Sequence, residues 1–158
     1  SRGSCEVKRK MRIYVDADAC PVVRQTEKIA EKYNVPVTLI CDTNHMLSSG
    51  YSDIIVADAG ADSVDIVLVN RCSKGDIVVS QDYGVAAMAL GKGAYPIHQN
   101  GRWYTNENID ELLMQRHMAK AARRKGKNHL KGPKKRTAED DARFMESLER
   151  LVIKLLEK

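Results

Sequence analysis

Aspartates stand at the ends of three short apolar segments of this chain. Asp16 and Asp18 follow the first segment. Asp58 follows the second segment and Asp82 follows the third, the segments being residues 13–15, 53–57 and 77–80. Each has the composition of a buried parallel strand, and the carboxyl ends of parallel strands meet at one sheet edge, where ligands bind. Carboxylates gathered there are the hard oxygen ligands that Mg²⁺ and Mn²⁺ prefer, and these ions commonly serve phosphate chemistry.

The helical segment that follows the second apolar segment contributes two more aspartates, Asp62 and Asp65. Their side chains are predicted to lean toward the same edge of the sheet. Like charges gathered at one edge repel each other unless a cation, a shared proton or solvent relieves the repulsion. A bound Mg²⁺ or Mn²⁺ is the simplest explanation for the carboxylates expected there, which include Asp16, Asp18, Asp65 and Asp82.

Each aspartate also has a structural interpretation, because Asp is a preferred N-cap residue and is stabilised at the positive end of a helix. Asp62 would cap the helix that follows it, and Asp82 would cap a helix that begins at Tyr83. For any one of them alone, capping explains the residue at least as well as catalysis does. Capping does not explain Asp16, which lies several residues before the next predicted helix. The other aspartates near strand boundaries are interpreted as turn residues: Asp42, Asp53, Asp58 and Asp76.

Other site chemistries lack their sequence patterns. The chain has neither a G-x-x-x-x-G-K-[ST] loop nor a G-x-G-x-x-G motif after a strand, so nucleotide-binding interpretations lack their backbone cradle. Its four histidines show no metal-ligand spacing, and its four cysteines form no C-x-x-C pair. Cys20 precedes a predicted helix, a position that can activate a thiol, but no partner base is identifiable. We therefore do not expect Cys20 to be a nucleophile.

The positive charge of the chain is concentrated in one segment. The net charge is +5, yet residues 116–136 hold ten Lys and Arg residues and no Asp or Glu. Such a cluster is typical of a surface that binds a polyanion, although a solvated helix face and loop would have the same composition. We expect the segment to bind RNA phosphates. Its basic residues are Arg116, Lys120, Arg123, Arg124, Lys125, Lys127, Lys131, Lys134, Lys135 and Arg136.

Apolar segments alternate with helical patterns along the chain. This alternation predicts an α/β fold of three layers, in which an open, mainly parallel sheet is covered by helices on both faces. Pro96 favours an edge position for the last strand, and Asn100-Gly101 fits a hairpin turn after it. Strands are expected near residues 13–15, 37–41, 53–57, 77–80 and 94–97, and helices near 21–33, 62–72, 83–92, 107–124 and 137–158.

The last of these helices has the clearest pattern. Thr137 and Asp140 fit a capping box, and an apolar stripe runs along one side of the helix. The stripe comprises Phe144, Leu148, Leu151, Val152 and Leu155. It must be buried against the body of the protein or against a second subunit. The sequence is therefore compatible with a monomer and with a homodimer.

The 158 residues have the length of one domain with an appendage. We expect an N-terminal extension or cloning remnant at 1–10, an α/β domain at 11–124, a basic flexible loop at 125–136 and a C-terminal helix at 137–158. No apolar stretch approaches the roughly 20 residues of a membrane helix. No signal peptide is evident, so the expected location is the cytoplasm.

A group of motifs carries a family resemblance. It comprises D-A-D-A-C-P at 16–21, G-D-I-V-V-S-Q-D at 75–82, G-K-G-A at 91–94 and G-P at 132–133. With these motifs the chain closely resembles the bacterial YaiI/YqxD family of uncharacterised proteins, from residue 11 to about 151. That family looks similar to the PIN-like and NYN nuclease superfamily, whose members use a few acidic residues at the sheet edge to hold Mg²⁺ or Mn²⁺ for RNA cleavage.

The resemblance implies a PIN-like domain and roles for five aspartates. Asp16, Asp65 and Asp82 would be the catalytic metal ligands, and Asp18 and Asp62 would be supporting ligands. The leading hypothesis is therefore a metal-dependent ribonuclease. A non-catalytic RNA-binding or regulatory protein that retains the fold is the alternative. A phosphatase for small substrates is a third interpretation, but ten clustered cations exceed what a small phosphate needs.

Overall fold

The computed structural model describes residues 11–18, 20–42, 48–57, 63–124 and 135–157. No helix within these ranges has the length and hydrophobicity needed to cross a bilayer. The predicted N-terminal extension and most of the predicted basic loop lie outside the described ranges. The elements are β1 (Ile13–Asp16), α1 (Val23–Lys32), β2 (Val37–Asp42), β3 (Asp53–Ala57), α2 (Val64–Arg71), β4 (Ile77–Val79), α3 (Tyr83–Gly91), β5 (Tyr95–Ile97), α4 (Ile109–Arg124) and α5 (Ala138–Leu156).

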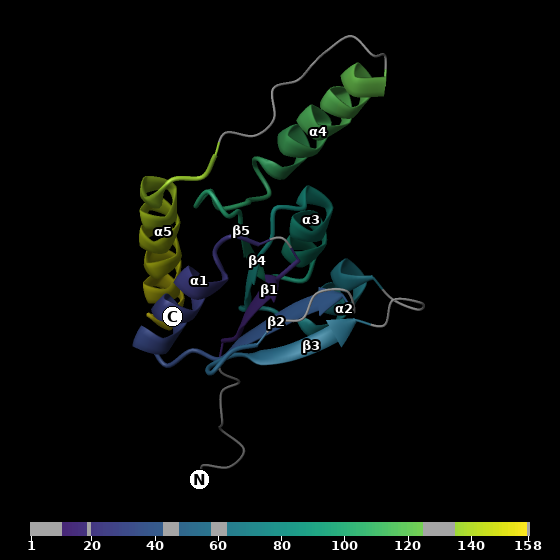
Figure 1. Cartoon of the computed structure of the whole chain (residues 1–158). Coiled ribbons are helices and arrows are strands. Elements are labelled where there is room, and N and C mark those ends of the chain that lie inside the picture. The colour runs from purple at the N-terminus through teal and green to yellow at the C-terminus, as the bar shows by residue number, and fades with distance from the viewer. Residues whose placement is uncertain (1–10, 19, 43–47, 58–62, 125–134, 158) are drawn as a thin grey trace.

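The five strands form one open sheet in the order β3-β2-β1-β4-β5 (Figure 1). All four pairings within it are parallel, which confirms the predicted α/β class. The chain builds the sheet outward from β1 to β3, then returns to place β4 on the other side of β1. The strand order therefore reverses between β1 and β4.

Helices cover both faces of the sheet, as predicted for three layers. Alternating side chains of a strand point to opposite faces, so Ile13 and Val15 pack in one apolar cluster and Tyr14 packs in another. The first cluster lies beneath α1 and α5, and the second lies beneath α2 and α3. A third cluster joins α3 to α4 through Ala86 and Leu112. Figure 1 shows α4 extending away from the sheet beyond α3.

α5 packs against α1 of the same chain. Thr137 and Asp140 form the predicted capping box at its start. Four residues of the predicted apolar stripe are buried in the cluster beneath α1: Phe144, Leu148, Leu151 and Val152. At the side of this contact, Glu149 accepts hydrogen bonds from Lys32 at 2.5 Å and from the hydroxyl of Tyr33 at 2.6 Å.

β5 lies at an edge of the sheet, as Pro96 predicted, and the predicted hairpin follows it. Ile97 forms an antiparallel bridge to Trp103. Gly101 in the turn has φ +95, and a Cβ there would lie 3.2 Å from the carbonyl oxygen of Arg143 on α5. Glycine is thus required both by the backbone conformation and by the close approach of α5.

Three helix starts differ from the sequence prediction. α4 begins at Ile109 instead of near residue 107. The N-cap position of α2 is held by Ser63, whose carbonyl accepts the N–H of Val67 at 3.1 Å. The prediction of Asp62 as the cap was therefore wrong by one residue, and Asp62 itself lies outside the described residues. α1 begins at Val23 instead of Pro21, because Pro21 belongs to a turn before the helix.

The chain that enters β3 is anchored on α1 by a buried carboxylate. Glu27 accepts hydrogen bonds from the hydroxyls of Ser49 and Ser52, the latter at 2.6 Å, and from Arg24 at 3.1 Å. Burial by itself would raise the pKa of Glu27, but these hydrogen bonds outweigh burial and lower it. Glu27 therefore stays ionised inside the protein.

Candidate functional site at the carboxyl edge of the sheet

Asp16 is the last residue of β1 and lies where the strand order reverses. β1 pairs with β2 on one side and with β4 on the other, so the ends of β1 and β4 flank the switch point at which open α/β sheets bind ligands. Ser80, the first residue after β4, donates its hydroxyl to Asp16 Oδ2 at 3.1 Å. The same hydroxyl accepts the N–H of Asp82 at 3.0 Å. Ser80 thus links two of the predicted acidic residues.

Asp16 lies within electrostatic range of three of the other predicted acids. Burial raises the pKa of its carboxyl to about 6, against a hydrogen bond from Ser80, and the negative charges of Asp18, Asp82 and Asp65 raise the pKa further. Four of the five predicted aspartates therefore lie within electrostatic reach of this edge. The fifth, Asp62, is outside the described residues.

Asp82 is both an N-cap residue and an ion-pair partner. Its Oδ1 accepts the N–H of Gly84 at 2.8 Å and of Val85 at 3.3 Å, which confirms the predicted cap of α3. The same oxygen lies 3.2 Å from Nη1 of Arg116 on α4. Its other oxygen, Oδ2, accepts no hydrogen bond from any described residue. The cap and the ion pair therefore both use Oδ1, and Oδ2 has no hydrogen bond from a described residue.

Asp65 and Asp18 approach the edge from α2 and from the end of β1. Asp65 Oδ1 accepts the hydroxyl of Ser63 and the N–H of Ile66, the latter at 3.0 Å, while Oδ2 accepts no hydrogen bond from the described residues. Both carboxylate oxygens of Asp18 lie 3.2 Å from the backbone nitrogen of Asp42. Asp18 thus ties the chain after β1 to the end of β2.

A small pocket opens at the same edge. It has a volume of about 10 Å³, which is room for roughly one water molecule or ion. Burial raises the pKa of Cys20 in its wall to about 11, so this thiol stays protonated at neutral pH. The lining residues are Asp16, Asp18, Cys20, Val79, Ser80, Gln81 and Gln99.

The donors at this edge fit the chemistry of a hard divalent cation. Three oxygens, Asp16 Oδ1, Asp65 Oδ2 and Asp82 Oδ2, accept no hydrogen bond from the described residues, and carboxylate oxygens are the preferred ligands of Mg²⁺ and Mn²⁺. Within the described ranges, however, no three Asp, Glu, His or Cys side chains stand together as a finished metal site. The edge brings carboxylates within electrostatic range of one another, but the described residues do not arrange them as a complete coordination sphere.

The predicted basic segment is described only in part. Arg116 and Lys120 are exposed on α4, and Lys135 is exposed before α5. Arg123 and Arg124 belong to α4 by their backbone. Four more of its residues, and the side chains of Arg123 and Arg124, lie outside the described part of the chain: Lys125, Lys127, Lys131 and Lys134.

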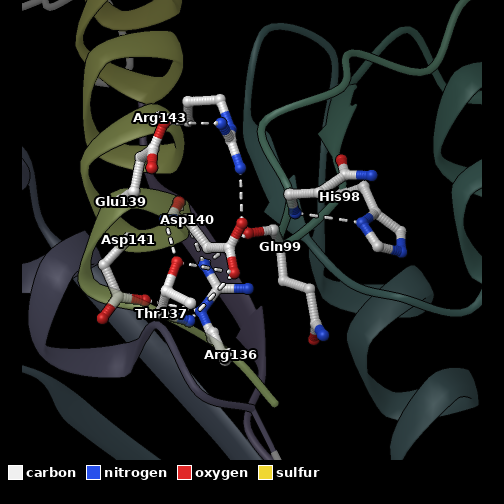
Figure 2. A network of polar contacts seen from close by, with 9 residues as sticks. His98, Gln99, Arg136, Thr137, Glu139, Asp140, Asp141 and Arg143 are labelled. Atoms are coloured by element: carbon white, nitrogen blue, oxygen red, sulfur yellow. Dashed lines mark hydrogen bonds and ion pairs between the residues drawn. The ribbon is translucent and has the colours of Figure 1, made fainter. Parts of the chain in front are cut away.

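Arg136, the last residue of the basic segment, makes intramolecular contacts (Figure 2). Its Nε donates to Asp141 at 2.5 Å, and its Nη2 donates to the carbonyl oxygen of Gln99 at 2.8 Å. The guanidinium therefore connects the start of α5 to the turn after β5. This contact fixes the backbone of Gln99, the neighbour of His98, to the chain at the start of α5.

Comparisons with known proteins find relatives over nearly the whole chain. A family model described as "Uncharacterized BCR, YaiI/YqxD family" matches residues 14–154. The chain belongs to the YaiI/YqxD family. A UPF0178 protein of Clostridium acetobutylicum is 63% identical over 145 residues, covering 91% of this chain and 98% of the relative. UPF0178 proteins of Alkaliphilus oremlandii and Clostridium tetani are 53% and 54% identical, covering 94% and 87% of this chain and 92% and 94% of theirs. No solved structure matches the chain.

In this member of the YaiI/YqxD family, the pocket includes polar residues that the sequence analysis did not single out. Ser80 and Gln81 lie in the motif at 75–82, where polar residues directly after a buried strand could have indicated an exposed sheet edge. Gln99 follows β5 and carries no such local signal. It joins the pocket that Asp16 lines only because β5 lies beside β4 and β4 lies beside β1.

Proposed function

We propose that this YaiI/YqxD protein is a Mg²⁺- or Mn²⁺-dependent nuclease that hydrolyses phosphodiester bonds of RNA. The observation that supports this function most is the position of Asp16 at the strand switch point, within electrostatic reach of Asp18, Asp65 and Asp82. Carboxylates at this edge of a parallel sheet are suited to hold a divalent cation beside a phosphate. The resemblance to PIN-like nucleases points the same way.

Asp16, Asp65 and Asp82 would hold the cation through Oδ1 of Asp16 and Oδ2 of Asp65 and Asp82, which accept no hydrogen bond from the described residues. Asp18 and Asp62 would be supporting ligands. A bound Mg²⁺ or Mn²⁺ supplies a water of lowered pKa and offsets charge on the scissile phosphate. The protein's own groups orient the ligands. The hydroxyl of Ser80 fixes Asp16, and the N–H groups at the start of α3 fix Asp82.

Arg116 would bring a positive charge to the same edge. Its guanidinium is exposed, and its Nη1 is 3.2 Å from Asp82. A guanidinium can contact two phosphate oxygens at once and stabilise the charge that develops on them. Lys120, exposed one helical turn further along α4, would extend this surface along the RNA backbone, giving affinity without a choice of sequence. The remaining cations of the basic segment would add phosphate contacts, except Arg136, whose guanidinium is already bound to Asp141 and Gln99.

The proposal places this activity in the cytoplasm. Cys20 and Cys41 carry free thiols, which is typical of a reducing compartment.

A non-catalytic RNA-binding protein is the second candidate. Two observations favour it: Asp82 already uses one oxygen for its cap and for Arg116, and no three described ligands stand at metal-binding spacing. In this case the acidic edge would be structural, and the basic segment alone would bind RNA.

The test measures Mn²⁺ binding by calorimetry and RNA cleavage with and without divalent cations. We expect the parent protein to bind Mn²⁺ and to cleave only in its presence, and Asp16→Asn and Asp82→Asn each to lose both properties. The matched control is Asp53→Asn, whose carboxylate is 76% exposed at the start of β3, at the other end of the strands. It should behave like the parent.

Two other outcomes would change the conclusion. Undiminished Mn²⁺ binding in the double variant Asp16→Asn, Asp82→Asn would contradict the site. Mn²⁺ binding by the parent without divalent-dependent cleavage would keep the site and favour the non-catalytic candidate.

A further inference from the structure

Three aromatic rings cluster in the segments that adjoin the pocket residues Ser80, Gln81 and Gln99. Tyr83 opens α3 directly after Asp82, and His98 follows β5. Their ring centroids are 6.3 Å apart. Both rings contact Tyr104 nearly edge-on, at centroid distances of 5.7 Å from Tyr83 and 6.1 Å from His98. We call Tyr83 and His98 the aromatic pair.

Tyr104 is a fixed support for the aromatic pair. Its side chain is 3% exposed, and its hydroxyl donates to the carbonyl oxygen of Ser80 at 3.1 Å. Since the hydroxyl of Ser80 binds Asp16, the pair and the acid are positioned by the same end of β4. Tyr83 and His98 themselves are partly exposed. Their planes are inclined by 51°, so they do not stack on each other. Both side chains keep part of their surface accessible, although Tyr83 also packs against the apolar cluster that joins α3 to α4.

His98 is held in place by the turn that follows β5. Its Nδ1 accepts the N–H of Asn100 at 3.0 Å, and Arg136 fixes the neighbouring Gln99 by its carbonyl oxygen, as Figure 2 shows. Burial lowers the pKa of the imidazole against the hydrogen bond to Asn100, and the charges of Arg102 and Arg136 lower it further. The ring is therefore neutral at neutral pH and presents an aromatic face instead of a cation.

Two amides share the pocket with the acid and adjoin the aromatic pair in the chain. Gln81 and Gln99 line the pocket together with Asp16, and each is within two residues of one member of the pair in the chain. An amide both donates and accepts hydrogen bonds, as the polar edge of a nucleobase does. Rings that stack, amides that pair and carboxylates at a phosphate site match the three parts of a nucleotide.

We propose that Tyr83 and His98 form a subsite for an unpaired nucleobase, which stacks on their rings while Gln81 and Gln99 contact its polar edge. This inference rests on the proposed function and names its substrate class as single-stranded nucleic acid, whose bases can turn out to stack on protein rings. A duplex keeps its bases inside the helix and offers no face to the pair. Because every base has a π-face, the subsite would depend on stacking strength more than on sequence.

The test compares two fluorescent probes by anisotropy in chelator-containing buffer, so that binding is measured without cleavage. One probe is a single-stranded RNA oligonucleotide, and the other is the same sugar-phosphate chain without bases. Tyr83→Leu and His98→Leu remove the aromatic face, whereas the matched controls Tyr83→Phe and His98→Phe keep it. We expect each Leu variant to bind the RNA about 10-fold more weakly than the parent does, because base stacking on one ring has roughly this effect. Tyr83→Phe should match the parent. His98→Phe should lose less affinity than His98→Leu, because it keeps the ring face but not the acceptor for the N–H of Asn100. All proteins should bind the abasic probe equally.

Equal binding of the RNA by the parent and the Leu variants would overturn the subsite, as would an equal loss of affinity for both probes or no binding of RNA by the parent. If the subsite were overturned in one of these ways but the parent still cleaved RNA with Mn²⁺, the proposed function would stand. In a further outcome, the parent binds the RNA through its bases and the Leu variants lose this binding, yet the parent shows no divalent-dependent cleavage. That result would support the subsite and overturn the proposed nuclease activity. Circular dichroism checks folding, and if one Leu variant is unfolded the other position decides.

Discussion

Asp16 combines partial burial with neighbouring negative charges, and this should be visible in the pH dependence of stability. The pKa of its carboxyl rises from the usual 3.8 to about 6 in the folded protein. The folded state therefore binds the proton more tightly than the unfolded chain does, and the free energy of unfolding falls as pH rises between these two values. About two pKa units correspond to roughly 3 kcal/mol, and solvent access reduces the expected effect to on the order of 2 kcal/mol.

We predict that Asp16→Asn removes the fall in the free energy of unfolding that ionised Asp16 causes as pH rises. The variant should be more stable than the parent by on the order of 2 kcal/mol near pH 7 and nearly equal to it near pH 4, because Asn resembles the protonated acid. Urea unfolding at both pH values measures the difference. Asp53→Asn, at an exposed carboxylate, should follow the parent at both. A variant of Asp16 that is less stable near pH 7 would show that its hydrogen bond to Ser80 outweighs the repulsion.

Arg116 and a divalent cation would compete for Asp82. Arg116→Ala should therefore strengthen Mn²⁺ binding by roughly 5-fold, the effect of removing one nearby positive charge in a partly solvated site. It should also slow RNA cleavage, because a phosphate contact is lost. Its effect on stability should stay within about 0.5 kcal/mol, since the ion pair is exposed.

The control for Arg116→Ala is Lys120→Ala, which removes an exposed charge of the same helix that has no described contact with Asp82. Calorimetry should give it the Mn²⁺ affinity of the parent. Identical Mn²⁺ binding by the two variants would mean that the pair of Arg116 and Asp82 does not influence the cation site.

At the scale of the element, local signals predicted more than long-range ones. The capping box of α5, the edge position of β5 and the hairpin at Asn100-Gly101 were all readable because a few adjacent residues determine them. The start of α2 was wrong by one residue, because Asp62 and Ser63 are both good N-cap types and sequence alone does not rank them. The anchoring of the chain before β3 by Glu27 had no local signal, since Ser52 is 25 positions away.

Glu27 is predicted to stabilise the connection into β3. Glu27→Ala should lower the free energy of unfolding by about 2 to 3 kcal/mol, because the hydroxyls of Ser49 and Ser52 lose their acceptor inside the protein. The pKa of Glu27 is lowered on folding, so its contribution is present above the usual pKa of 4.5 and is lost as pH falls through the lower folded-state value.

Urea unfolding of the parent, Glu27→Ala and Glu31→Ala near pH 7 and near pH 3 tests this role. Glu31 is exposed on the same helix, so its variant should cost less than about 0.5 kcal/mol. The gap between Glu27→Ala and the parent should narrow at the lower pH. A gap that does not change with pH would indicate that packing, not the carboxylate charge, is what Glu27 supplies.

At the scale of the whole molecule, the sequence predicted that acidic residues would meet but not which residues would join them. Any parallel sheet brings strand ends to one edge, so Asp16 and Asp82 were expected together without knowledge of the strand order. Gln99 and His98 depend on that order, because β5 reaches the site only by pairing with β4. Several orders are compatible with the same alternation of strands and helices, and this is why the residues after β5 were not predicted as part of the site.

The uneven distribution of charge gives a prediction for the intact protein. Replacing Lys120, Arg123, Arg124 and Lys127 with Gln should weaken RNA binding and lower the slope of log affinity against log salt by about 3, since each phosphate contact on a single strand contributes roughly 0.7. Stability should change little. Binding titrations at several salt concentrations measure the slope.

A variant with Arg143, Arg150 and Lys154 replaced by Gln removes exposed charges of α5 instead. It should keep most of the salt dependence. An unchanged slope in the first variant would mean that RNA does not contact the basic segment.

The docking of α5 also bears on how the protein is made. α5 follows every other described element in the chain, yet Phe144, Leu148 and Val152 complete the apolar cluster that β1 and α1 begin. During translation, the sheet and α1 leave the ribosome before their cover has been synthesised, and exposed apolar surface of this kind attracts chaperones and promotes aggregation. A message interrupted shortly before α5 would therefore yield an insoluble chain, although every residue of the acidic edge would already have been translated.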